Sequence, residues 1–488
     1  MKRLVMLMFV VALCPQLASA QGAISASAAA DVNDDGAVNV SDVQLAINAA
    51  LGSAVVSKAS PDAALTGTEV AILGNNFSMS PASNTIDFGG GVTAAASAVE
   101  LVRGQRAILR VTVPKGLAAG PVMLTVTSNG VAASGSATLE VLTGPRVSTV
   151  AGTGVQGFGG DGGPAIAATL NRPEDVAVTA ATIYVADTSS NRVRAIDRGT
   201  GLISTFAGTG AGSHSGDGGQ ASQAGLFNPQ AVAVDSAGNV FVSATGDSRV
   251  RRIDAVTGVI QTVAGTGAFA FNGESGQGDQ VALNFPRGLA VDLQGNLLIC
   301  DTNNSRIRRL NTSTGMIETI AGSGPGGGMS AGFSGDGGQA TSALLQNPAG
   351  VCVDGQGNIY VADRGNHRIR MINASTGVIT TVAGTGVAGF TSAAGPALSA
   401  DLNAPGGVSL LAPGQLLISE SSNHVLRLLD LGTGTLSLFM GDGMPGDSGD
   451  GGLAQDARLR GPGRMAVSSS GEVFIAEQDG ARVRLVSP

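Results

Sequence analysis

The sequence is poor in aromatic, thiol and imidazole side chains. Its 488 residues include no Trp, 2 Tyr, 3 Cys and 3 His. Sugar-binding surfaces usually stack their ligand on exposed Trp and Tyr rings, so direct carbohydrate binding is disfavoured. Three cysteines are too few for a disulfide scaffold, and stability must come from packing. Cys300 and Cys352 fall in apolar, strand-like runs, which predicts buried thiols and leaves open whether the two pair.

An excess of basic residues and long apolar runs are also missing. There are 28 Lys and Arg against 36 Asp and Glu, which argues against nucleic acid because phosphate binding needs a basic surface. The apolar run at residues 4–13 is too short to span a bilayer, and no later run comes near the length needed. It follows Lys2 and Arg3 and precedes an Ala-Ser-Ala cleavage site at residues 18–20. This pattern predicts a signal peptide at residues 1–20, no membrane span, and a secreted, extracellular or cell-surface protein exported from a bacterium.

Glycine, in contrast, is abundant, with 74 residues. Glycine at this density between periodic apolar runs predicts many short strands joined by tight turns. From residue 146 onward one unit recurs six times, at intervals of about 57 residues. Each unit carries a Leu three places before a Pro, and these prolines are Pro173, Pro229, Pro286, Pro348, Pro405 and Pro462. Four strand-length runs per unit predict a four-stranded antiparallel sheet, and six such sheets predict a six-bladed β-propeller over residues 144–488 of a mainly β protein.

The two ends of this repeat region complement each other. The sixth unit stops at RVRLVSP, after its third strand, whereas RVSTVAG at residues 146–152 precedes the first unit as a spare fourth strand. We expect residues 146–152 to complete the last sheet, which closes the ring and covers an exposed strand edge.

The polar bends between second and third strands carry a family resemblance. DTSSNRVR (187–194), DTNNSRIR (301–308), DRGNHRIR (363–370) and ESSNHVLR (420–427) resemble NHL repeats, whereas the second unit departs from the pattern with Ala244 and Ser248. The resemblance implies a propeller used mainly for binding, with a minority of enzymes.

Residues 57–143 differ from this repeat and read as strands joined by glycine turns. The cues GNNF (74–77), FGG (88–90) and a Val-Pro-x-Gly ahead of GPVMLTV resemble the IPT/TIG family. That resemblance implies an immunoglobulin-like β-sandwich acting as a spacer. The segment has no cysteine pair, so apolar burial must hold its two sheets together.

Residues 31–42, DVNDDGAVNVSD, have the spacing of an EF-hand-type calcium loop, with oxygen ligands around a glycine at the sixth place. SDVQLAINAALG, which follows, predicts a helix. Residues 21–56 therefore predict a loop–helix module that binds one Ca2+, the alternative being a turn that binds nothing. The predicted ligands are Asp31, Asn33, Asp35, the carbonyl of Ala37, Asn39 and Asp42.

The Asp at the twelfth place of this loop resembles dockerin repeats. Dockerins usually carry two such loops and dock on a cohesin, and only one loop is found here. Whether the module docks on a cohesin-like or cell-surface protein therefore stays open.

The loops that lead into the first strands share one end of the propeller with the polar bends, and we call them lead-in loops. Each of four lead-in loops has an Asp in a glycine turn, which we expect to cap its own turn, the alternative being ligand binding. These residues are Asp161, Asp217, Asp336 and Asp450. Three places before the position of this Asp, five of the six units have a residue expected to pack the loop onto the sheet: Phe158, His214, Phe271, Phe333 and Phe390.

The polar bends also repeat an arginine that we expect to pair with an acid five residues before it, the alternative being a basic fringe on a binding face. The arginines are Arg192, Arg249, Arg306 and Arg368, and the acids are Asp187, Asp301 and Asp363. The positions predicted to face the central channel are Glu174, Gln230, Arg287, Ala349, Gly406 and Gly463.

This mixture of channel residues lacks the metal cage or the paired acid and base of an enzyme, and no catalytic residue is predicted. We expect an exported, non-enzymatic binding or scaffold protein that presents the propeller face to a protein or peptide partner, with a calcium-binding N-terminal anchor. The alternative is a component of an extracellular polysaccharide-degrading assembly, or a propeller lyase or hydrolase.

Overall fold

The computed structural model describes residues 55–487, apart from gaps at 61–62, 66–68, 76, 90–91, 102–105, 115–116, 118–119, 134–135, 143 and 324–331. The contacts divide the chain into two compact units, with the division between Gly144 and Pro145. Among the described residues, no helix is long and apolar enough to cross a membrane. The predicted signal peptide and the predicted calcium ligands lie outside the described residues; these ligands are Asp31, Asn33, Asp35, Ala37, Asn39 and Asp42.

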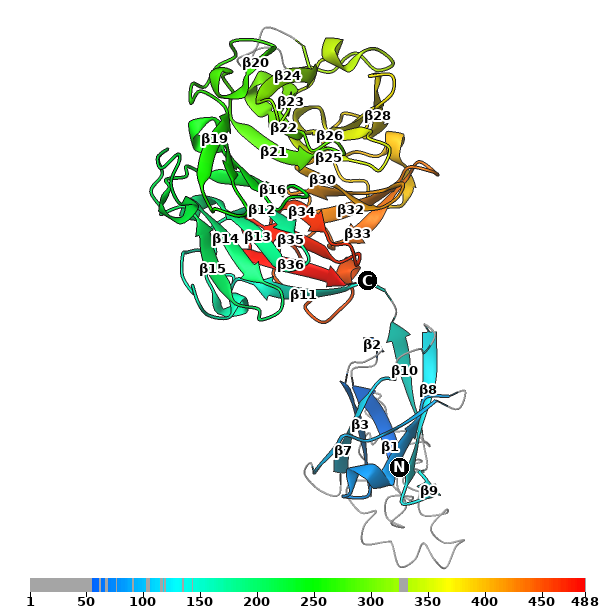
Figure 1. The fold of residues 1–488 in the computed structure, drawn as a ribbon. Coiled ribbons are helices and arrows are strands. Elements are labelled where there is room, and N and C mark those ends of the chain that lie inside the picture. The colour runs from blue at the N-terminus through cyan, green and yellow to red at the C-terminus, as the bar shows by residue number, and fades with distance from the viewer. Residues whose placement is uncertain are drawn as a thin grey trace, which may run out of the picture. The chain divides into compact units, whose positions relative to one another are not determined.

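The first unit holds two sheets within its described part (Figure 1). One sheet has the order β1 (Val55–Ser60), β3 (Glu69–Asn75), β7 (Arg106–Thr112) and β6 (Ala98–Leu101), with antiparallel pairing. The other has the order β2 (Ala63–Leu65), β10 (Ala137–Leu142), β8 (Gly120–Ser128), β4 (Asn84–Asp87) and β5 (Thr93–Ala95), and β9 (Val131–Ala132) pairs with β8. The pairing of β2 with β10 is parallel. A 3-10 turn, η2 (Pro81–Ser83), precedes β4.

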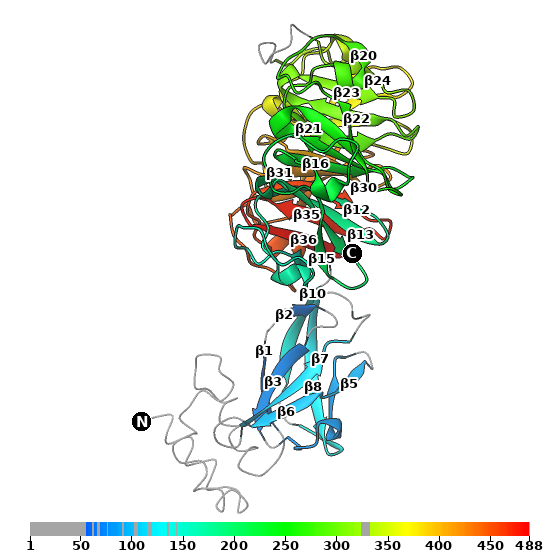
Figure 2. The ribbon, with the colours of Figure 1, turned by 60° about the vertical axis from the view of Figure 1, so that its left-hand side comes forward.

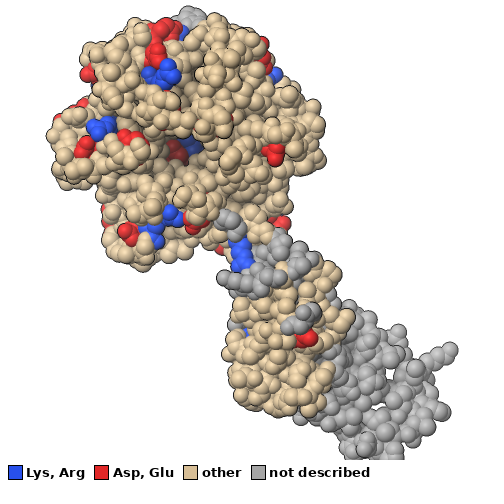
Figure 3. All heavy atoms as spheres, turned by 45° about the vertical axis from the view of Figure 1, so that its right-hand side comes forward, with Lys and Arg blue, Asp and Glu red and all other residues tan. Residues whose placement is uncertain are grey.

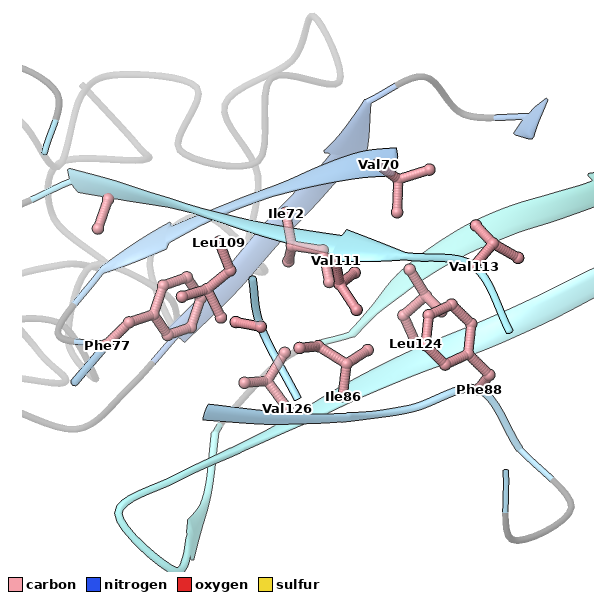
Figure 4. Close-up of a cluster of buried hydrophobic side chains, with 12 residues drawn as sticks. Val70, Ile72, Phe77, Ile86, Phe88, Leu109, Val111, Val113, Leu124 and Val126 are labelled. Atoms are coloured by element: carbon pink, nitrogen blue, oxygen red, sulfur yellow. The ribbon is translucent and has the colours of Figure 1, made fainter. Parts of the chain in front are cut away.

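Alternate side chains of these strands form the core of the first unit (Figure 4). Val70 and Ile72 of β3 come from one sheet, and Leu124 and Val126 of β8 come from the other. The two sheets thus bury one face each against the other, as expected for a sandwich held by apolar packing.

The second unit contains six antiparallel sheets in its described residues, which we number in chain order. Sheet 1 has β12 (Pro173–Val178), β13 (Thr182–Asp187), β14 (Arg192–Asp197) and β15 (Ile203–Ala207). Sheet 2 has β16 (Pro229–Val234), β17 (Val240–Ala244), β18 (Arg249–Ile253) and β19 (Ile260–Ala264). Sheet 3 has β21 (Pro286–Val291), β22 (Leu297–Asp301), β23 (Arg306–Leu310) and β24 (Met316–Ala321), with β20 (Ser275–Gln277) beside β24.

The remaining sheets follow the same plan. Sheet 4 has β25 (Pro348–Val353), β26 (Ile359–Asp363), β27 (Arg368–Ile372) and β28 (Ile379–Ala383). Sheet 5 has β30 (Gly407–Ala412), β31 (Gln415–Glu420), β32 (Val425–Asp430) and β33 (Thr435–Met440), with β29 (Gly395–Pro396) beside β33. Sheet 6 has β34 (Pro462–Val467), β35 (Val473–Glu477), β36 (Arg482–Ser487) and β11 (Arg146–Ala151).

Short 3-10 turns punctuate the connections. The lead-in loops carry η3 (Ala165–Ala167), η5 (Ala221–Gln223), η7 (Gly278–Gln280), η9 (Ala340–Ser342), η11 (Ala397–Ser399) and η12 (Ala454–Asp456). The polar bends of sheets 1 to 4 carry η4 (Thr188–Ser190), η6 (Thr245–Asp247), η8 (Thr302–Asn304) and η10 (Arg364–Asn366).

The first strands contact one another in a closed cycle. β12 contacts β16, β16 contacts β21, β21 contacts β25, β25 contacts β30, β30 contacts β34, and β34 contacts β12; Figure 2 gives a second view of these strands. β11 pairs antiparallel with β36, beginning with Arg146 opposite Ser487, and the two strands lie side by side in Figure 1. This is the pairing that the sequence predicts for residues 146–152, and it buries Val147 and covers the edge of β36.

Candidate functional site

A central pocket forms where the first strands begin and the second strands lead into the polar bends. It has a volume of about 210 Å³, and Figure 3 shows a hollow in the second unit with basic and acidic atoms at its bottom. Its lining residues at or just before first strands are Arg172, Glu174, Arg287, Ala349, Gly406, Pro462, Gly463 and Arg464, and those from bends are Arg364, Ser421 and Gln478. The positions predicted to face the channel line this pocket, apart from Gln230.

Arg464 spans the centre of the ring. Its Nε and Nη2 donate to the carbonyl of Ala349 at 3.0 and 2.7 Å, and its Nη1 donates to the carbonyl of Gln230 at 2.8 Å. One side chain of sheet 6 therefore connects sheets 2 and 4. Gln230 thus contributes through its backbone.

The sequence analysis missed Arg464, although the repeat contains a signal for it. Arg464 stands two places after the unit's proline, where four other units have a small residue: Ala231, Gly288, Gly350 and Gly407. A Cβ on Gly288 would lie 2.5 Å from the Ala349 carbonyl oxygen, so the crowded inner strand excludes a larger residue at Gly288. The only charged residues at this place in the six units are Arg464 and Asp175.

Asp175 belongs to sheet 1 and is buried next to the centre. It accepts hydrogen bonds from the backbone N–H groups of Val176 at 2.8 Å and Val232 at 3.1 Å. Burial raises the pKa of Asp175 to about 7, and the charge of Arg464 opposes this shift. Burial thus favours the neutral form of the Asp175 carboxyl group, and the guanidinium of Arg464 favours the charged form.

The pocket carries more positive than negative groups. Within the described residues, no hydrogen bond or ion pair engages the guanidinium groups of Arg287 and Arg364, and the Nε of Arg287 is buried. Arg172 lies 3.8 Å from Asp479 and is half exposed. Burial lowers the pKa of Arg287, the charge of Glu174 opposes this shift, and neighbouring arginines add to it.

A second set of arginines is buried inside the sheets, and it corrects the predicted pairing. The acid at the end of the second strand pairs with the arginine seven residues later, as in Asp363 with Arg370 at 3.4 Å. The other pairs are Asp187–Arg194, Asp301–Arg308, Glu420–Arg427 and Glu477–Arg484. The prediction had chosen the arginine five residues later, in Arg192, Arg249, Arg306 and Arg368, and it was wrong.

The arginines chosen by that prediction have a different role. Arg192, Arg306 and Arg368 lie over phenylalanine rings of the lead-in loops, with centroid distances of 3.7, 3.9 and 3.8 Å. These rings are Phe158, Phe271 and Phe333, so the predicted packing of the loop is a cation–π contact. Five of the six bends contain two arginines, the exception being sheet 5 with Val425 and Arg427, and no local feature tells which of the two lies deeper.

The lead-in aspartates fasten their loops to the sheets, which corrects the predicted turn caps. Asp336 lies 2.7 Å from Nη2 of Arg370 and accepts a hydrogen bond from the Thr381 hydroxyl at 2.7 Å. The equivalent ion pairs are Asp161–Arg194, Asp217–Arg251 and Asp450–Arg484. In sheet 2, where Ala244 replaces the inner acid, Asp217 remains as the partner of Arg251.

Histidines in the bends link neighbouring sheets. Nδ1 of His367 accepts a hydrogen bond from the backbone N–H of Ala404 at 3.0 Å, and Nδ1 of His424 accepts one from Gly461 at 3.2 Å. Asn191 makes the same link to Asn228 at 2.9 Å in sheet 1. Burial lowers the pKa of both histidines, as expected for rings that are neutral acceptors.

Comparison with known proteins identifies the repeat. Residues 283–310 and 345–370 match the NHL repeat model, and residues 209–272 match the Teneurin NHL domain model. The second unit contains NHL repeats. The chain is similar to Protein SUPPRESSOR OF QUENCHING 1, chloroplastic, of Arabidopsis thaliana, with 31% identity over 55% of this chain and 26% of that protein. It is also similar to human NHL repeat-containing protein 2, with 28% identity over 56% of this chain and 40% of that protein.

The chain thus spans well under half the length of these curated relatives. A solved structure, an auxiliary nutrient binding protein from Bacteroides ovatus ATCC 8483, is similar over 89% of this chain and 98% of its own, with a TM-score of 0.55 and 16% identity. At this identity the likeness concerns the fold, which is that of an NHL-type β-propeller.

Two cysteines and a histidine are the other candidate residues in the second unit. Cys300 and Cys352 are free thiols, and burial raises the pKa of both, that of Cys300 to about 12. Nε2 of His214 lies 3.1 Å from the Thr262 hydroxyl. Among the described residues, no group of three or more His, Cys, Asp or Glu is placed to hold a metal ion.

Proposed function

We propose that the protein is an exported, non-enzymatic binding protein whose six-bladed NHL propeller presents the mouth of its central pocket to a protein or peptide partner. The observation that carries the proposal is the central pocket, which is lined by the unpaired side chains of Arg287 and Arg364 and by Arg464, whose guanidinium connects two sheets. In this proposal an immunoglobulin-like spacer of the IPT/TIG type and a calcium-ordered dockerin-like anchor precede the propeller.

The rigidity of the pocket mouth supports a binding role. The bends around it are fixed by hydrogen bonds to the next sheet, such as that from Ala404 to His367, and by buried ion pairs such as Arg370 with Asp363. A preformed surface binds with a smaller loss of conformational entropy than a mobile one. Proteins of the same fold include ones described as auxiliary nutrient binding proteins.

Capture of the partner from the secreted proteins of the source organism tests this proposal. A Ser421→Trp variant places a bulky ring at the pocket mouth, whereas Ala237→Trp places the same ring in the exposed turn between β16 and β17, at the opposite end of the strands. We expect Ser421→Trp to lose the partner and Ala237→Trp to keep it. Equal capture by both variants would refute a role for the mouth.

The anchor needs a separate test, because its ligands lie outside the described residues. We expect calorimetry of the full-length protein to show one calcium ion bound per chain, and a variant with Asp31→Ala and Asp35→Ala to lose it. If the wild type takes up no calcium, the anchor is not a calcium module. Repeating the capture with a calcium chelator shows whether the partner binds through the anchor or through the propeller.

A further inference from the structure

The charges in the central pocket are out of balance. Arg287 and Arg364 line it without a hydrogen bond or ion pair to any described residue. Arg464 donates its hydrogen bonds to two backbone carbonyls, which carry no net charge. Glu174 is the one acidic residue among the described lining residues. The chain as a whole has a net charge of −8, so this local positive charge runs against its composition.

An unpaired arginine inside a cavity destabilises the protein unless something neutralises it. Removing a guanidinium from water costs free energy, and an ion partner or hydrogen-bond acceptor normally compensates. The second unit provides such partners for its fully buried arginines, for example Asp363 for Arg370. For Arg287, whose Nε is buried, the described chain provides no hydrogen bond or ion pair, and the charge of Glu174 offsets the effect of burial only in part. An anion from outside would supply the rest of the counter-charge.

The pocket's size and lining narrow the class of anion. Its volume of about 210 Å³ is below the roughly 300–1,000 Å³ of typical small-molecule sites, so it holds one terminal group of a larger molecule. No aromatic residue is among its described lining residues, which disfavours a sugar ring. Planar guanidinium groups match a carboxylate with two parallel hydrogen bonds, and Glu174 disfavours a doubly charged phosphate.

We propose that the central pocket binds a carboxylate of the peptide partner, from an acidic side chain or from the C-terminus, between Arg287 and Arg364. The proposal rests on the proposed function and specifies the group that the mouth recognises. The carboxylate replaces the missing counter-charge, and Arg464 forms the floor on which the group stops.

Calorimetry of the full-length protein with short alanine peptides tests the proposal. One peptide is blocked at both ends and carries a glutamate side chain, one has a free C-terminal carboxylate, and one has neither. We expect the third peptide not to bind, and the better of the first two identifies the source of the group. Tighter binding of inorganic phosphate or of glucuronate than of both acidic peptides would overturn the carboxylate-peptide assignment, as would no binding at all.

Three variants separate recognition from folding. Arg287→Met should lower the affinity for the acidic peptide at least tenfold. It should leave the unfolding temperature of the free protein unchanged or higher, because the arginine makes no hydrogen bond or ion pair with a described residue. Glu174→Gln should raise the affinity for the acidic peptide about tenfold, equivalent to about 1.4 kcal/mol. A folding defect cannot produce such a gain in affinity. The matched control is Arg309→Met, on an exposed arginine that pairs with Glu318 outside the pocket, and it should leave affinity unchanged. A lower unfolding temperature for Arg287→Met, or no gain for Glu174→Gln, would show that the pocket charges serve the fold.

The failure of this proposal can be told from failure of the proposed function. If Ser421→Trp loses the captured partner while Arg287→Met keeps it, the mouth binds a partner and the carboxylate proposal is wrong. If acidic peptides bind but Ser421→Trp captures the same partner as the wild type, the carboxylate site is supported and the proposed function is wrong.

Discussion

The buried ion pair of sheet 4 allows the cost of losing its arginine to be predicted as a free energy of unfolding. Arg370 is fully buried and contacts Asp363, also fully buried, at 3.4 Å and Asp336 at 2.7 Å. Replacing Arg370 with Met keeps the apolar stem of the side chain and removes the charge. Asp363 then keeps only Asn366 and the backbone N–H of Gln346 as partners.

The size of the effect follows from the distances. At an effective dielectric constant of about 20, two unit charges separated by the Arg370–Asp363 distance attract by about 5 kcal/mol. Part of this is offset because the arginine no longer has to be removed from water. Breaking a buried pair by removing one partner typically costs about 3–5 kcal/mol, and we expect Arg370→Met to lower the free energy of unfolding by that amount.

The loss should depend on pH. Burial already raises the pKa of Asp363 to about 6, and loss of the arginine charge raises it further. A carboxyl group with a raised pKa in the folded state favours folding at low pH and disfavours it as the pH rises through that pKa. The cost of Arg370→Met should therefore be largest near pH 8 and shrink towards pH 5.

Urea denaturation with thiol labelling measures this loss in the propeller alone. The protein lacks Trp, so the buried thiols of Cys300 and Cys352 are better reporters, in a background where Cys14 is Ser. Asp363→Ala recreates the arrangement of sheet 2, where Ala244 stands at this place, and should cost only about 1–2 kcal/mol. The double variant should cost at least about 2 kcal/mol less than the sum of the single changes. Additive effects, or a loss below about 1 kcal/mol for Arg370→Met, would refute the reasoning.

Three other changes test the repeated bends and the ring closure by the same urea assay. Ala404 has a left-handed backbone (φ 48°), as does Asn347 at the matching place. Because Asn tolerates this conformation better than Ala, we expect Ala404→Asn to raise the free energy of unfolding by about 0.5–1 kcal/mol. A lower free energy of unfolding would show that the Asn side chain is not accommodated. Burial lowers the pKa of His367 below 6.5, so the neutral ring contributes to the free energy of unfolding above pH 6.5, and this contribution is lost as the pH falls towards the folded pKa. His367→Asn, which copies Asn191, should therefore make the free energy of unfolding less sensitive to acid. An unchanged dependence of that free energy on pH would contradict this. Val147→Ala should cost about 2 kcal/mol because the side chain is 1% exposed, and hydrogen exchange should rise in β36; an effect below about 0.5 kcal/mol would mean that β11 adds little to closure.

Much of the second unit can be predicted from the sequence because its pattern is local and repeated. The prolines mark where first strands begin, as at Pro173 for β12 and Pro462 for β34, although β30 begins at Gly407, after its proline. The predicted channel positions could be assigned by counting from these prolines. Periodicity and turn chemistry are enough for this level of description.

The chemistry of the pocket could not be predicted in the same way, because it depends on contacts across the ring. Arg464 donates to the carbonyl of Gln230, 234 positions earlier in the chain, and no local pattern encodes that contact. Five of the six bends contain two arginines two places apart, and which one lies deeper emerges only once the lead-in loop is folded over them. Asp336 was expected to cap its turn, and its real partner, Arg370, lies 34 positions away.

The pairing of β11 with β36 also determines when, during synthesis, the ring of sheets can close. Arg482 at the start of β36 donates to the carbonyl of Thr153, 329 positions earlier. At about 5–20 residues per second of translation, a nascent chain waits roughly 20–60 seconds between making β11 and making the strand that receives it. Throughout that interval the edge of β11 lacks its partner, so a ribosome that stalls within β36 leaves a chain whose ring of sheets is not closed.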